Sequence, residues 1–123
     1  MKTILKLFTL GLCLVTLTLY SQAPQSFSYQ AVARNNSGEA IAKQNVSFKI
    51  SLLQGSTTGT AVYSETHAIQ TDDYGIVNLA IGGGTKVSGD FASINWAVGP
   101  YFVKVEMDAN GGSTYALMGT SQL

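Results

Sequence analysis

Alternation of apolar and polar side chains is the feature that most limits what this chain can form. In the clearest run every second residue from Val46 to Leu52 is apolar, whereas Ser47, Lys49 and Ser51 between them are polar. A period of two places successive side chains on opposite faces of a β-strand. We therefore predict a half-buried strand here, with its apolar face on the core.

The same pattern recurs along the chain between Gly-, Asn- and Asp-rich turns. The further predicted strands cover residues 27–34, 61–70, 76–82, 101–107 and 113 onward. Short strands separated by turn residues at this spacing are typical of β-sandwiches and not of α/β folds. The sequence predicts an all-β, antiparallel β-sandwich of about seven strands.

Residues 82–100 break the alternation. Three consecutive glycines, Gly82–Gly84, favour a bulge or a tight crossing between sheets. After them, Ser88 or Asp90 is a suitable cap for a short helical turn. That turn would lay Phe91 and Ile94 over one end of the sandwich.

The N-terminus has the layout of a secretory signal peptide. Lys2 and Lys6 precede an apolar run from Leu7 to Leu19, and the small residues Ser21 and Ala23 follow it. A membrane-spanning helix needs about 20 apolar residues, so a permanent anchor is the weaker alternative. We predict a helical signal peptide over residues 1–21, cleaved near Ser21, and no membrane span afterwards.

Charge and cysteine content restrict the remaining domain, residues 22–123. Of all residues 11% are charged, and seven basic against seven acidic side chains cancel, which argues against nucleic-acid binding. The single cysteine, Cys13, lies inside the leader. Lipidation at Cys13 is a minor alternative, because the preceding Leu12 is bulky. We expect a secreted or cell-surface domain without disulfides.

No catalytic set emerges from the sequence. The only histidine, His67, has Asp72 and Asp73 nearby in sequence, but there is no Gly-x-Ser-x-Gly elbow. Alternation groups His67 with Tyr63 and Glu65, and we expect this group on the solvent face. One histidine and no mature cysteine cannot form a zinc site. We predict a non-enzymatic domain.

Two loops have compositions that are similar to ligand-binding loops but fail the full pattern. Asp108 and Asn110 resemble the start of a calcium loop, yet Gly119 stands where the bidentate glutamate is needed. Residues 82–86 lack the order of a phosphate-binding loop. We predict turns at both places and no metal or cofactor.

Aromatic residues near strand ends are the remaining candidates for a ligand or interaction surface. Trp96, Tyr74 and Tyr101 could stack on sugars, as exposed aromatic residues of secreted β-sandwiches do. However, Trp96 lies close in sequence to Phe91 and Ile94, which favours a place in the core.

Several segments together resemble a known group of domains. They are Phe27–Asn35 (FSYQAVARN), Gly55, Tyr63–His67 (YSETH), Ile81–Thr85 (IGGGT), Val87–Phe91 (VSGDF), Trp96, Gly99–Lys104 (GPYFVK) and Gly119–Leu123 (GTSQL). This set resembles the N-terminal domain of secreted surface and tail-fibre-like proteins of Gram-negative bacteria. More loosely, residues 71–81 are similar to the turn and strand of transthyretin-like and other Ig-like sandwich domains.

The resemblance implies a role and no catalytic residues. Such domains follow a signal peptide and precede collagen-like repeats, fibre segments or a self-cleaving chaperone of the endosialidase type. We therefore expect a structural or adhesive module, the N-terminal part of a longer protein. Its partners would be its own downstream domains or other surface proteins. The alternative is a carbohydrate-binding module whose partners are glycans. If the last strand is an unpaired edge, we also expect pairing through residues 113–123.

Overall fold

A computed structural model of the chain describes residues 25–123. The predicted signal peptide and its cleavage site lie outside these residues. Within them, no helix is long and apolar enough to cross a membrane. The strands, in chain order, are β1 (Phe27–Val32), β2 (Asn45–Gln54), β3 (Thr60–Gln70), β4 (Ile76–Ile81), β5 (Thr85–Gly89), β6 (Tyr101–Asp108) and β7 (Ala116–Gln122).

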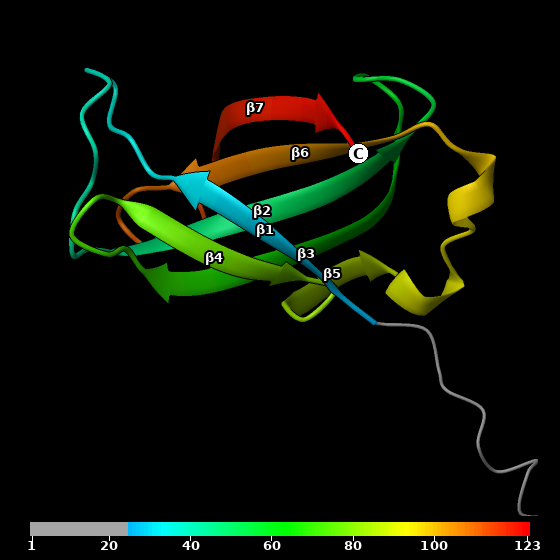
Figure 1. Cartoon of the computed structure of the whole chain (residues 1–123), viewed down its shortest axis with the longest axis horizontal. Helices are drawn as coiled ribbons and strands as arrows, with labels where there is room; N and C mark the ends of the chain where they lie inside the picture. The colour runs from blue at the N-terminus through cyan, green and yellow to red at the C-terminus, as the bar shows by residue number, and fades with distance from the viewer. Residues whose placement is uncertain (1–24) are drawn as a thin grey trace, which may run out of the picture.

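The seven strands form two antiparallel sheets that pack as a sandwich. The larger sheet has the order β5-β3-β2-β6-β7, and the smaller one pairs β1 with β4. Figure 1 shows β1 and β4 crossing in front of the larger sheet. The predicted all-β antiparallel sandwich of about seven strands is confirmed.

The core lies between the two sheets and follows the alternation of the sequence. From the larger sheet, Phe48, Ile50 and Val103 are almost completely buried. From the smaller sheet, Val77 and Ile81 on β4 meet them. Burial of these side chains is the main force that holds two sheets face to face.

Strand β2 is buried on both faces and not only on its core face. It lies between β3 and β6, and Ser47 and Ser51 on its outer face are each 5% exposed. The serine side chain is short, so residues on the neighbouring strands β3 and β6 cover it. The hydroxyl of Ser64 on β3 donates to the hydroxyl of Ser51 at 3.0 Å. The prediction of a half-buried strand was therefore wrong for these serines, because their central position buries them.

The glycine run is the crossing from the smaller to the larger sheet, as predicted. Gly82–Gly84 join β4 to β5, and Gly82 adopts a φ of 101°. At Gly84 a Cβ atom would lie 2.6 Å from Glu65 Oε2 and 2.6 Å from His67 Nε2. Only glycine therefore fits at this crossing.

After β5 the chain forms two 3-10 turns, η1 (Phe91–Ser93) and η2 (Trp96–Val98). Of the two predicted caps, Asp90 is the one used: its side chain accepts from the backbone N–H of Ala92 at 3.3 Å and from Ser93 Oγ at 2.7 Å. Ser88 belongs to β5, a strand that the sequence did not indicate. Phe91 and Ile94 pack against the core, as expected.

Candidate functional site

His67, the residue considered and rejected as a catalytic candidate, makes a structural contact beneath the glycine crossing. Glu65 is completely buried, and its carboxylate contacts His67 Nε2. The same carboxylate accepts the N–H groups of Gly82 at 2.7 Å and Gly84 at 3.2 Å. The crossing thus does hold an anion, but the anion is the side chain of Glu65.

The expectation that Tyr63, Glu65 and His67 face solvent was wrong. Tyr63 and Glu65 are buried, and His67 pairs with the core residue Phe48 across β2 and β3. Burial, followed by the hydrogen bond and negative charge of Glu65, raises the pKa of Tyr63 to about 12. A buried carboxylate needs several donors, and the two glycine amides supply them. Alternation could not show this, because both faces of β3 carry mixed side chains.

The two aspartates considered beside His67 serve the β3–β4 turn instead. Asp72 Oδ1 accepts from the N–H groups of Tyr74 at 2.8 Å and Ile76 at 2.9 Å. Asp73 forms an exposed ion pair with Lys43 at 3.2 Å. Both carboxylates therefore have partners of their own, and the carboxylate that contacts His67 is that of Glu65.

The loop whose start resembles a calcium loop is a hairpin turn between β6 and β7, as predicted. Asp108 accepts from the N–H groups of Asn110 at 2.9 Å and Thr114 at 3.0 Å. These backbone hydrogen bonds, that of Asn110 first, lower the pKa of the Asp108 carboxyl. Across residues 25–123 no group of three or more His, Cys, Asp or Glu side chains is placed to hold a metal ion.

The three predicted surface aromatic residues do not form one site. Tyr74 is 74% exposed in the β3–β4 turn, beyond the end of β4 that pairs with Val32. Trp96 contacts Phe27, at the opposite end of β1. Tyr101 is buried, and its hydroxyl donates to the Asn95 carbonyl at 2.7 Å. Tyr74 is thus separated from the other two by the length of β1.

Trp96 belongs to an aromatic cluster at this end of the sandwich. It makes edge-to-face contacts with Phe27, Phe91 and Tyr101, with ring centroids 6.1, 5.8 and 5.2 Å apart. The indole remains 45% exposed. Trp96 also lines a small apolar groove of about 190 Å³ with Phe27 and Leu123. It is therefore neither a buried core plug nor a free platform.

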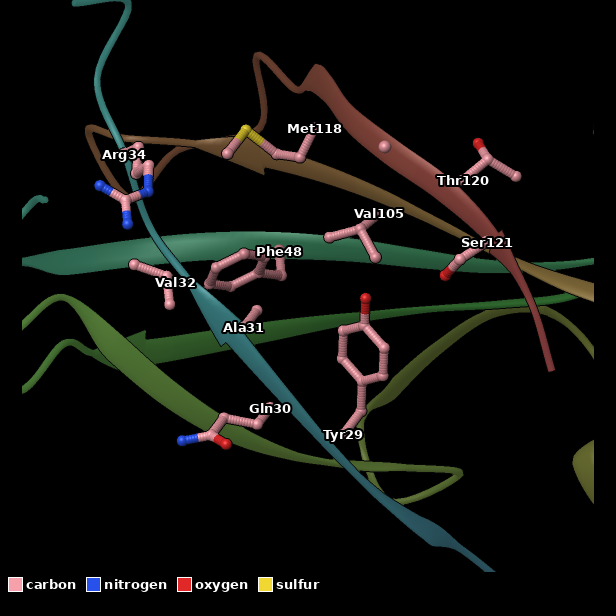
Figure 2. Close-up of a pocket in the computed structure, with 11 residues that line it drawn as sticks. Tyr29, Gln30, Ala31, Val32, Arg34, Phe48, Val105, Met118, Thr120 and Ser121 are labelled. Atoms are coloured by element: carbon pink, nitrogen blue, oxygen red, sulfur yellow. The ribbon is translucent and has the colours of Figure 1, made fainter. Parts of the chain in front are cut away.

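A further feature that alternation did not indicate is a groove along one side of the sandwich. Its volume is about 460 Å³, and it lies between β1 and β7. Phe48 and Val105 of the larger sheet contribute to its wall, and the Tyr29 ring points from β1 toward β7 (Figure 2). Of the described residues that line it, only Arg34 is charged. The sandwich is open here because the smaller sheet has only two strands.

The opposite side of the sandwich is bridged by a loop. There the crossing Gly82–Gly84 connects the two sheets directly, and Glu65 binds it from the larger sheet. The groove could not be located from the sequence, because it depends on which strands share a sheet.

A family model described as Domain of unknown function (DUF8740) matches residues 28–120. The chain belongs to this family. The matched region of the DUF8740 domain runs from β1 into β7, so it includes both borders of the groove. Searches of curated proteins and of solved structures each found no significant match.

Proposed function

We propose that this DUF8740 domain is a non-catalytic, extracytoplasmic structural or adhesive module of a secreted surface or fibre protein. The observation that carries the proposal is the open side of the sandwich, bordered by β1 and β7. Neither strand has a pairing partner on its outer edge among the described residues. Unpaired strand edges recruit further strands, which suits a module whose work is assembly.

Two sequence features support the same proposal. The N-terminal 21 residues have the layout of a signal peptide, and segments such as GTSQL at Gly119–Leu123 resemble N-terminal domains of tail-fibre-like proteins. The contacts of His67 agree with a non-catalytic role, because its recorded partner is the buried Glu65 and not a nucleophile.

Cell fractionation of the full chain in a Gram-negative host tests this proposal. We expect a leader-processed form outside the cytoplasm. The control variant Leu14→Arg interrupts the apolar run of the leader and should hold the chain inside, unprocessed. An unprocessed cytoplasmic wild-type chain would overturn the proposal.

Carbohydrate binding is the second candidate, favoured by one observation. Trp96 is half exposed and borders an apolar groove with Phe27 and Leu123, a combination that suits stacking on a sugar ring. A glycan array should then show binding that Trp96→Ala abolishes and Tyr74→Ala, at the other end of the molecule, retains. Near-UV circular dichroism must show that Trp96→Ala still folds. Equal binding by both variants would exclude this site.

A further inference from the structure

The outer edges of β1 and β7 offer unpaired backbone groups on the same side of the molecule. At the end of β1, the N–H of Ala33 donates to the carbonyl of Gly75, and its own carbonyl accepts from Ile41. Backbone groups of successive residues in a strand point to opposite edges. Those of Val32, and of alternate residues before it, therefore point away from β4 to the free edge.

These two edges lack the charged residues and prolines that often prevent strand pairing. Neither FSYQAV in β1 nor ALMGTSQ in β7 contains a charged residue or a proline. By contrast, the other outer strand of the larger sheet, β5, has five residues, a register shift against β3 and the charged Lys86. Natural proteins protect edges by shortness, bulges and lysines. Strand β5 combines all three, whereas β1 has none and β7 has only a register shift against β6, between Val105 and Glu106.

The two free edges are complementary to each other in direction and length. The start of β1 and the chain end after β7 share one groove, lined by Phe27 and Leu123, while Val32 and Met118 line the other groove together. The strands therefore run antiparallel, as the arrows in Figure 1 show. They have six and seven residues. One edge belongs to each sheet.

We propose that two copies of the chain close each other's open side, with β7 of each copy pairing antiparallel to β1 of the other. This inference rests on the proposed assembly role and names its partner. A two-fold axis parallel to the strands brings the larger sheet of one copy beside the smaller sheet of the other. Each joined sheet then contains five strands from one copy and two from its partner.

A second copy suits this side of the molecule better than a charged partner does. Both pairing strands are uncharged, so the two copies meet without like-charge repulsion along the ladder. Val32, Leu117 and Met118 are exposed apolar residues on these strands, at 39%, 63% and 41%. The two-fold axis keeps each residue at its position along the strand direction, so Val32 of one copy lies beside Met118 of the other. The contact covers apolar surface that water contacts in the single copy.

The substitution Gly119→Glu tests the interface without disturbing the single copy. Gly119 pairs with the buried Val105, so a side chain there points into the groove, and an added Cβ would meet no atom within 4 Å. The control Asn78→Glu adds the same charge on the outer face of β4, away from both free edges. Circular dichroism checks that both variants fold.

Light scattering on the exported protein over a range of concentrations gives the result. We expect a dimer mass for the wild type and for Asn78→Glu. For Gly119→Glu we expect a dissociation constant at least about tenfold higher, because closing the interface would take the added carboxylate out of water. A wild type that is monomeric at every concentration overturns the proposal. A monomer whose groove is filled by a strand of another protein overturns it as well.

Cross-linking then tests which edges pair. Gln30 and Thr120 lie midway along β1 and β7, and Cys13→Ser removes the only other thiol. With a short bis-maleimide, co-expressed Gln30→Cys and Thr120→Cys chains should link to each other, and neither should link alone. Linking by Thr120→Cys alone would show β7 pairing with β7 and would contradict the arrangement.

The outcomes separate this inference from the proposed function. An exported monomer leaves the surface-module proposal standing and removes the dimer. An unprocessed dimer in the cytoplasm supports the dimer and removes the surface-module proposal.

Discussion

Glu65 is the residue whose surroundings depend most on the whole fold. Its carboxylate is completely buried and is shared by His67 and the N–H groups of Gly82 and Gly84. It therefore joins β3 of the larger sheet to the crossing that leads from the smaller one. A buried carboxylate is tolerated only with such a set of partners.

Removing this carboxylate should destabilise the domain severely. We expect Glu65→Ala to lower the free energy of unfolding by about 3–5 kcal/mol, because it leaves His67 and two partly buried N–H groups without their acceptor. Glu65→Gln should cost about 1–3 kcal/mol, since one amide oxygen replaces two carboxylate oxygens. Urea unfolding measures both.

The control for this series is Glu106→Gln on β6. Glu106 is partly exposed and approaches Lys104 at 3.8 Å, so its loss should change stability by less than about 0.5 kcal/mol. Equal effects of Glu65→Gln and Glu106→Gln would mean that the Glu65 contacts contribute little.

Asp108 should make stability depend on pH in acid. Its folded pKa is lowered by backbone hydrogen bonds, first that of Asn110. Its stabilisation is therefore fully present above the unfolded pKa of about 4 and is lost as pH falls through the lower folded pKa. We expect Asp108→Asn to flatten the acid limb of a stability-against-pH curve, and an unchanged acid limb would contradict this role.

At the residue scale the sequence predicted turns better than it predicted contacts. Asp90, Asp108 and the glycine run lie where local rules placed them, because caps and turns depend on neighbours in sequence. Glu65 and His67 were misplaced, since their partners come from the crossing between sheets.

At the scale of elements, strands with an apolar face were predictable and β5 was not. Every residue of β5 is exposed, so it forms through backbone pairing with β3 and leaves no alternation of burial. Strand β2 is buried on both faces, but the sequence predicts it as half-buried, because the polar serines on its outer face do not reveal that neighbouring strands cover them. Pairing partners decide both cases, and a single sequence does not contain them.

Hydrogen exchange should reveal the free edge of β1. We expect the amide of Val32 to exchange quickly in dilute protein and more slowly at concentrations where the proposed dimer forms. The amides of β2, paired on both sides, should be slow at both concentrations and serve as the internal reference. In Gly119→Glu, Val32 should stay fast throughout. Concentration-independent exchange in the wild type would contradict strand pairing at this edge.

At the scale of the whole molecule, alternation predicted two apolar faces but not how strands divide between sheets. The division into five and two leaves one side open, and this determines the groove. The long-range pairing of β1 with β4, far apart in sequence, has no local signal. The fold class was therefore predictable, whereas its open side was not.

Dimerisation should also appear in thermal unfolding. Because association stabilises only the folded chain, the melting temperature of the wild type should rise with protein concentration. Gly119→Glu should melt at a temperature that does not depend on concentration over the same range. A scanning calorimetry series over about a hundredfold concentration range makes the comparison, and parallel behaviour of the two proteins would contradict the dimer.

Phe27 and Leu123 border the same small groove, so the chain enters and leaves the sandwich at one end. A pulling force applied through these two residues peels β1 and β7 from that end, and their ladder bonds bear the load one after another. In the fibre role proposed above, the domain would therefore open strand by strand under tension and would add little to the length of the fibre.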